Sequence, residues 1–119
     1  MTTQEIAERL VAHCREGKWE AAQKELYAAD AVSIEPEGNS AFAKETKGLT
    51  AIIEKGRKFD GMIEKVHSIE ASHPLANGQS IAFVLKLDVT MKGEGRMAMS
   101  ELCVYHVKDG KIVYEEFHL

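Results

Sequence analysis

The segment from residue 81 to residue 91 constrains the fold more than any other part of the chain. All its odd-numbered positions are apolar, and its even-numbered positions include Lys86, Asp88 and Thr90. A period of two indicates a β-strand with one buried face, because successive side chains point to opposite faces of a sheet. The segment is longer than a typical strand of about 5–6 residues. The chain is therefore expected to build a sheet around one long strand.

Three turn signals divide the rest of this half of the chain. Asn77-Gly78 precedes the long strand, Gly93-Glu94-Gly95 follows it, and Asp109-Gly110 comes later. Asn-Gly is among the strongest signals for a hairpin turn, and Gly-rich segments between apolar runs indicate further hairpins. The turns predict a four-stranded antiparallel meander with strands over 62–75, 81–91, 96–107 and 112–119.

Helical patterns dominate the first half of the chain. Thr2 and Glu5 have the spacing of a capping box, and Ile6, Leu10 and Cys14 recur at intervals of four on one helical stripe. The expected elements are a helix to about residue 16, a helix over 18–26, a short strand over 31–35, a turn over 37–40 and a helix over 49–60. This order predicts an α+β domain with helices on one face of a curved sheet.

Composition narrows the class of protein. The chain has 119 residues and a net charge of −4, and 45% of its residues are hydrophobic. These values predict a single soluble domain over residues 1–119. The longest apolar run, Ile81 to Leu85, is far below the roughly 20 residues of a membrane span, so no membrane partner is expected. The N-terminus does not resemble a signal peptide, which favours the cytoplasm. The absence of a basic face disfavours nucleic acid.

No cofactor and no metal ion are expected from the motifs. The chain lacks HExxH, GxGxxG, GxxxxGK[ST] and GxSxG, which bind metals or nucleotides or carry an acyl-enzyme serine. Cys14 and Cys103 are far apart in the sequence and form no CxxC pair. They are therefore expected to be reduced residues of the core.

Four short motifs, in a fixed order, carry a resemblance to a known superfamily. They are Glu16-Gly17-Lys18-Trp19, the segment 27–32, the segment 47–52 and the segment 109–113. In these motifs the chain resembles the SnoaL-like and NTF2-like superfamily, which includes polyketide cyclases and ketosteroid isomerases. The resemblance implies an NTF2-like (cystatin-like) cone, in which three N-terminal helices pack on a strongly curved, mainly antiparallel sheet. It also implies a pocket in the cone for a small, largely apolar organic molecule.

The resemblance further implies a role for Glu35, which directly precedes Pro36. Ketosteroid isomerases carry an acidic residue before proline on the corresponding strand, and this carboxylate is their general base. The positions that resemble the two oxyanion donors of those enzymes hold Leu10 and Cys103 or a near neighbour of Cys103. Leu10 cannot donate a hydrogen bond, so the chain is not expected to isomerise steroids.

The strand pattern and the resemblance together predict the other residues of the pocket. Glu101 is unusual on a buried face, because ionised carboxylates are seldom buried without a partner, and burial raises the pKa of such a group. Glu101, Tyr105 and His67 are the expected hydrogen-bond or proton donors beside the base Glu35. The expected ligand-binding residues are Leu10, His13, Leu87, Met97, Met99, Cys103, Glu115 and Phe117.

Several alternatives stay open at this point. Glu35 can also be explained as an exposed residue at a turn, and Glu101 as a structural partner of Arg96 or Lys86. The domain is either an enzyme with acid/base chemistry of the isomerase, cyclase or dehydratase type, or a non-catalytic module for ligand binding or dimeric interaction. The outer face of the sheet mixes apolar and polar residues, which predicts a two-fold homodimer through this face.

Overall fold

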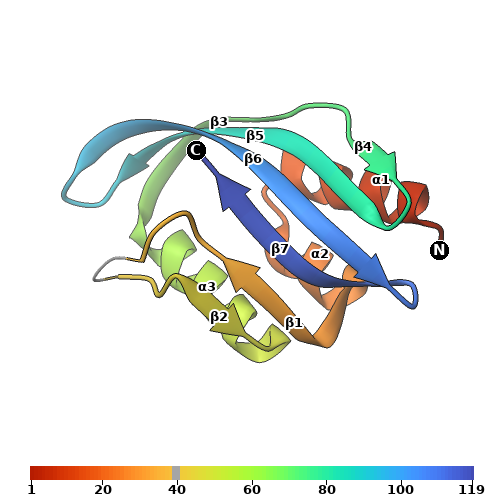
Figure 1. The fold of residues 1–119 in the computed structure, drawn as a ribbon. Helices are drawn as coiled ribbons and strands as arrows, with labels where there is room; N and C mark the ends of the chain where they lie inside the picture. Colours follow the sequence, from red (N-terminus) through yellow and green to blue (C-terminus); the bar gives the residue numbers. More distant parts are fainter. Residues whose placement is uncertain (39–40) are drawn as a thin grey trace.

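The computed structural model describes residues 1–38 and 41–119, and these form three helices and a seven-stranded sheet (Figure 1). Their order confirms the predicted α+β class, and most boundaries lie within a few residues of the prediction. Residues 39 and 40, part of the predicted turn, lie outside the described residues. The elements are α1 (Thr3–Arg15), α2 (Trp19–Leu26), β1 (Tyr27–Ile34), β2 (Glu45–Lys47), α3 (Leu49–Met62), β3 (Ile63–Ala71), β4 (Leu75–Asn77), β5 (Ser80–Met91), β6 (Gly95–Lys108) and β7 (Lys111–His118).

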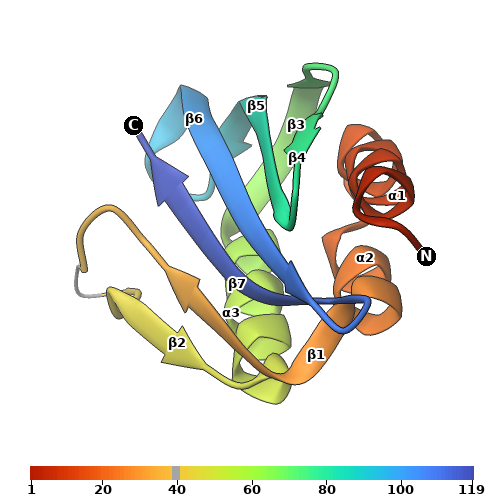
Figure 2. The same cartoon turned by 45° about the vertical axis from the view of Figure 1, so that its right-hand side comes forward.

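The sheet has the strand order β2-β1-β7-β6-β5-β3, with β4 paired to β5. Strands β3, β5, β6 and β7 are antiparallel neighbours, which confirms the predicted meander. Strand β1 lies parallel to β7 and antiparallel to β2, so the sheet is mixed. The strands curve strongly, and Figure 2 shows α3 on the concave side of the sheet with α1 and α2 beside it. This curvature produces the predicted cone.

Local sequence signals explain where the first helix begins and ends. The Thr2 hydroxyl accepts a hydrogen bond from the Glu5 backbone N–H at 3.1 Å, and the Glu5 carboxylate accepts one from the Thr2 N–H at 2.9 Å. This is the predicted capping box. Gly17 follows the helix with a φ of +70°, a conformation that favours glycine. The chain can therefore turn sharply into α2. No helix among the described residues is long and apolar enough to cross a membrane.

The core lies between the helices and the concave face of the sheet. Ile81, Phe83 and Val89 of β5 are at most 2% exposed, as the alternating pattern predicts. The Phe83 ring stacks on Tyr105 of β6, with centroids 5.6 Å apart and planes 8° apart. Equally buried side chains from the helices complete this core and include Ile6, Leu10, Leu26 and Ile52.

Irregular pairing in β3 overturns the strand pattern that was expected there. The register shifts between Val66 and Ser68, so His67 no longer shares a face with Ile69. A bulge of this kind moves a side chain to the opposite face of a sheet. His67 is exposed, and its Nε2 lies 2.7 Å from the Thr90 hydroxyl. The prediction that His67 reaches the pocket is therefore wrong.

Candidate functional site

A cavity of about 260 Å³ opens between the concave face of the sheet and the helices. This volume lies just below the range of roughly 300–1,000 Å³ that is usual for ligand pockets, so the cavity suits a small molecule. Its wall is mainly apolar and rich in aromatic rings. The aromatic side chains are those of Trp19, Tyr27, Phe42, Phe59, Tyr105 and Phe117.

Most of the predicted site residues meet at this cavity. They come from α1, from the end of β1 and from the central strands β5, β6 and β7, which are far apart in the sequence. The curvature of the sheet brings them to one wall. The predicted residues that line the cavity are Leu10, Glu35, Leu87, Met99, Glu101, Tyr105, Glu115 and Phe117.

Four predicted residues do not line the cavity. Besides His67, His13 lies between α1 and α2, where its Nε2 is 2.9 Å from a carboxylate oxygen of Glu25. Met97 lies close to the turn of the β5–β6 hairpin and is 37% exposed, because little covers the sheet there. Cys103 is fully buried in the core and does not line the cavity. The structure therefore does not bring these four residues to the cavity wall, where they were expected.

Glu115 is a buried carboxyl group that two hydroxyl groups hold in place. Tyr27 donates a short hydrogen bond to its Oε1, and the Ser33 hydroxyl donates to its Oε2 at 2.6 Å. Burial raises the pKa of Glu115, and the hydrogen bonds from Ser33 and Tyr27 oppose this change. Burial also raises the pKa of Tyr27 well above its ordinary value. Glu115, Tyr27 and Ser33 therefore form a hydrogen-bonded polar cluster at the cavity.

Lys55 of α3 connects this polar cluster to Glu35. Its Nζ donates to the Ser33 hydroxyl at 2.7 Å and to the Glu35 carboxylate at 2.9 Å. It also lies 5.8 Å from the centre of the Phe117 ring. The Lys55 side chain is only 14% exposed and the Glu35 side chain 26%. Glu35 is thus a paired residue of the cavity wall rather than a solvated residue at a turn.

Sequence reasoning did not identify Tyr27, Ser33 or Lys55 as site residues. One signal could have found Lys55, since it shares a helical stripe with Ile52 and Phe59, which also line the cavity. A lysine on an apolar stripe indicates a charge that faces the interior of the protein.

Glu101 is the carboxyl group best suited to exchange a proton near neutral pH. Burial, with the nearby charges of Glu35 and Glu115, raises its pKa to about 7, although Lys55 acts in the opposite direction. Among the described residues, no side chain forms a hydrogen bond or an ion pair with this carboxyl group. Arg96, which was one possible partner, instead binds Asp88 at 2.9 Å.

The remaining groups offer little metal or thiol chemistry. Within residues 1–38 and 41–119, no three His, Cys, Asp or Glu side chains are arranged to hold a metal ion. Cys14 lines the cavity, but burial raises its pKa to about 12, which disfavours the reactive thiolate. Carboxyl groups can act as acids or bases, so the acidic residues of this wall are chemically suited to proton transfer.

Gly56 lies inside α3 and lines the cavity, and an added Cβ atom would meet no other atom within 4 Å. We expect Gly56→Ala to raise the free energy of unfolding by about 0.8–1 kcal/mol, because glycine is a poor helix former. Urea unfolding measures this change. Gly61→Ala, in the same helix and equally unobstructed, is expected to give a gain of the same sign for the same reason. A destabilised Gly56→Ala would contradict the expectation.

Comparison with solved structures places this geometry among known proteins. A protein of Mesorhizobium loti, provisionally described as a SnoaL-like polyketide cyclase, is 33% identical over 100% of both chains, with a TM-score of 0.90. IdmH of Streptomyces antibioticus, provisionally described as a polyketide cyclase, is 18% identical, with a TM-score of 0.74 over 98% of this chain and 91% of that chain. A protein of Catenulispora acidiphila with a ketosteroid isomerase-like fold, solved in complex with trimethylamine, is 19% identical, with a TM-score of 0.75 over 99% of this chain and 87% of that chain.

The fold and the cavity define an NTF2-like, cystatin-like α+β domain. The family profile described as SnoaL-like domain matches residues 1–119. The chain therefore belongs to the SnoaL-like domain family, as the sequence motifs predicted. No protein of curated function matches the chain.

Proposed function

We propose that this domain binds a small, uncharged, largely apolar carbonyl compound in its cavity and moves a proton on the carbon beside the carbonyl group. The observation that carries the proposal is that Glu35 and Glu101 both line one open, mainly apolar cavity. A purely structural module would fill this space with side chains such as Met99 and Phe117. The two similar proteins that are provisionally described as polyketide cyclases share this fold, which supports the proposal.

The two carboxyl groups have complementary roles in the proposed reaction. Glu35 is the base, as its place before Pro36 suggested, and it removes a proton from the carbon beside the carbonyl group. Glu101, in its protonated form, donates a hydrogen bond to the carbonyl oxygen, where negative charge develops. The apolar wall keeps water away and strengthens both interactions. Return of the proton to a conjugated carbon isomerises the compound, and attack of the carbanion on a second carbonyl closes a ring.

Proton exchange of 2-tetralone in D₂O tests the proposal. Wild-type protein is expected to accelerate exchange of the protons beside the carbonyl group above the buffer rate, as ¹H NMR can measure. The rate constant per bound ketone is expected to fall as the pH rises above about 7, because Glu101 then loses its proton. Binding of 2-tetralone without any acceleration would instead support the non-catalytic ligand-binding module.

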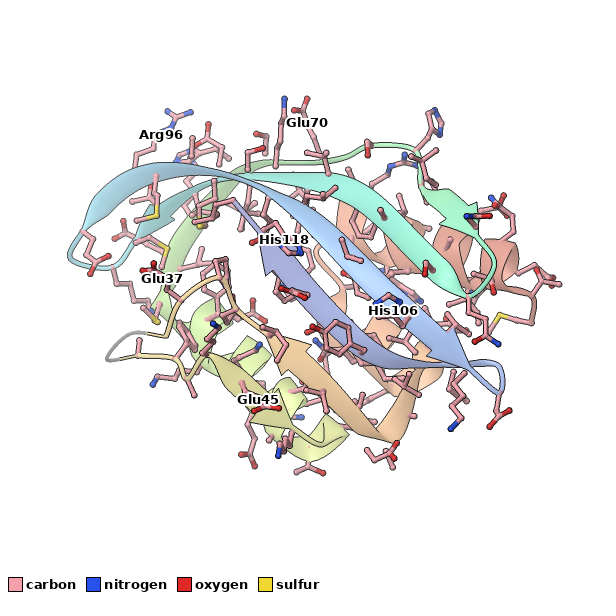
Figure 3. All side chains as sticks on the ribbon, in the orientation of Figure 1. Glu37, Glu45, Glu70, Arg96, His106 and His118 are labelled. Atoms are coloured by element: carbon pink, nitrogen blue, oxygen red, sulfur yellow. The ribbon has the colours of Figure 1, made fainter. Side chains whose placement is uncertain are left out.

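We also propose that two copies associate through the outer face of the sheet. His106 of β6 and His118 of β7 lie on this face, in front of the helices (Figure 3). Leu102, on the same face, pairs directly with His118 and with Val84 and is 42% exposed, so apolar side chains of neighbouring strands meet on this face. Light scattering is expected to give the mass of a dimer for the wild type and of a monomer for Leu102→Asp. A monomeric wild type would contradict the proposed interface.

A further inference from the structure

We propose that Lys55 is a catalytic residue of this site, whose ammonium group donates a second hydrogen bond to the carbonyl oxygen beside Glu101. This inference rests on the proposed function, because it assigns a residue to the same reaction. Neither the strand pattern nor the family resemblance identified Lys55.

The first argument is that one of the three N–H groups of Lys55 has no acceptor among the described residues. An ammonium group has three N–H bonds. Two of them are directed at the Ser33 hydroxyl, at 2.7 Å, and the Glu35 carboxylate, at 2.9 Å. The part of the chain that the structure describes offers no acceptor for the third, although Lys55 lines the cavity. A bound carbonyl oxygen can take this place.

The second argument is the charge of the cavity wall. Lys55 carries the only positive charge among the described residues that line the cavity, whereas Glu35, Glu101 and Glu115 are acidic. An enolate oxygen near the acidic groups alone would be repelled by any that are ionised. Because a positive charge stabilises a developing negative charge, Lys55 is the group that makes this wall suitable for an enolate.

The third argument is that Lys55 is held in place before a substrate arrives. Ser33, which accepts a hydrogen bond from Lys55, donates its own proton to the buried Glu115 carboxylate, and Tyr27 holds the other oxygen of Glu115. This chain of contacts joins α3 to β1 and β7. A donor that is already oriented needs little reorganisation during the reaction, and for this reason it stabilises the transition state more than a mobile group.

The position of Lys55 also keeps the charges balanced during the step. When Glu35 takes the proton, a C–H bond breaks, an O–H bond forms on Glu35, and the electron pair moves to the carbonyl oxygen as an enolate. Negative charge thus leaves the carboxylate that Lys55 binds and arises on the oxygen that its third N–H faces. Return of the proton from Glu35 to carbon reverses this transfer. Lys55 compensates the same unit of charge in both states.

The test is ¹³C NMR of 2-tetralone labelled at the carbonyl carbon, together with the exchange rate. A hydrogen bond from a cation moves the carbonyl signal downfield, and a purely structural role of Lys55 would not alter this signal. We expect the downfield shift in the wild type and in Lys65→Met, an exposed lysine of β3 outside the cavity. We expect Lys55→Met to keep only the part of the shift that Glu101 causes and to exchange protons about 10²–10³-fold more slowly.

Two further variants make the outcomes decisive. Lys55→Gln, which keeps an uncharged donor, replaces Lys55→Met if the latter does not fold, and it is expected to lose most of the shift. Tyr105→Phe tests the other donor that sequence analysis suggested, and it is expected to keep the shift. An unchanged shift in the Lys55 variants, or its loss in Tyr105→Phe alone, would overturn the inference.

The same measurements separate this inference from the proposed function. Exchange in the wild type that the Lys55 variants leave unchanged would refute the role of Lys55 and leave the proposed function standing. A downfield shift that Lys55→Met reduces, without exchange in the wild type, would refute the proposed function but retain the contact with Lys55. Failure of the wild type to bind millimolar 2-tetralone would overturn both.

Discussion

Replacement of Glu35 with Gln is expected to slow the exchange of 2-tetralone protons by about 10²–10⁴-fold, the usual contribution of a positioned general base. Glutamine has nearly the same shape as glutamate but cannot accept the proton. Lys55 keeps its hydrogen bond to Ser33, so the helix that carries it stays anchored to β1. The exchange rate in D₂O, followed by ¹H NMR, measures the effect. The protein concentration is chosen so that the protein-catalysed rate exceeds the buffer-catalysed rate.

Glu37→Gln provides a matched control for this variant. Glu37 lies two residues further along the same segment, is exposed and does not line the cavity (Figure 3). Its replacement changes the net charge of the protein by the same amount, so exchange at the wild-type rate is expected. Equal rates for Glu35→Gln and the wild type would show that Glu35 is not the base, whatever the rate of Glu37→Gln.

The parts of the fold that follow from local chemistry could be predicted from the sequence. The alternation in β5 fixed which of its side chains are buried, and the capping pattern of Thr2 and Glu5 fixed the start of α1. Three acidic residues that line the cavity were found only with the help of the family resemblance. The strand pattern and the resemblance together pointed Glu101 and Glu115 inward on β6 and β7, and the resemblance alone singled out Glu35, before Pro36.

The remaining features depend on contacts between distant segments. The bulge that turns His67 outward arises where β3 adjusts to β5, and no residue type near His67 marks that adjustment. Lys55 enters the site because α3 packs against β1, where Ser33 and Glu35 accept its hydrogen bonds. A periodic pattern identifies the inner face of one element, but it does not tell which elements will share a polar network.

A second large effect is expected in the stability of the protein. Replacement of Glu101 is expected to raise the free energy of unfolding rather than to lower it. The pKa of Glu101 is about 7 in the folded protein, against an ordinary value of 4.5, mainly because the charged form is desolvated. The folded state therefore binds a proton that the unfolded state has already lost between these two values. By linkage, the stability that protonated Glu101 contributes is present below about pH 4.5 and is lost as the pH rises to about 7.

Glu101→Gln removes this penalty because glutamine cannot ionise. We expect the variant to be more stable than the wild type by about 2 kcal/mol at about pH 8, allowing for partial solvent screening of the carboxyl group, and nearly equal to it at about pH 4.5. Urea unfolding across this range measures the difference. The free energy of unfolding of the variant is compared with that of the wild type at each pH. In this difference, the titration of every shared group that does not interact with Glu101 cancels.

Glu94→Gln, in the exposed turn between β5 and β6, is the control and is expected to differ little from the wild type at any pH. A stability difference for Glu101→Gln that does not change with pH would show that Glu101 ionises normally in the folded protein. The expected pH-dependent gain would instead show that this fold maintains a destabilising carboxyl group in its cavity. A residue that lowers the stability of the folded protein in this way typically serves binding or catalysis rather than folding.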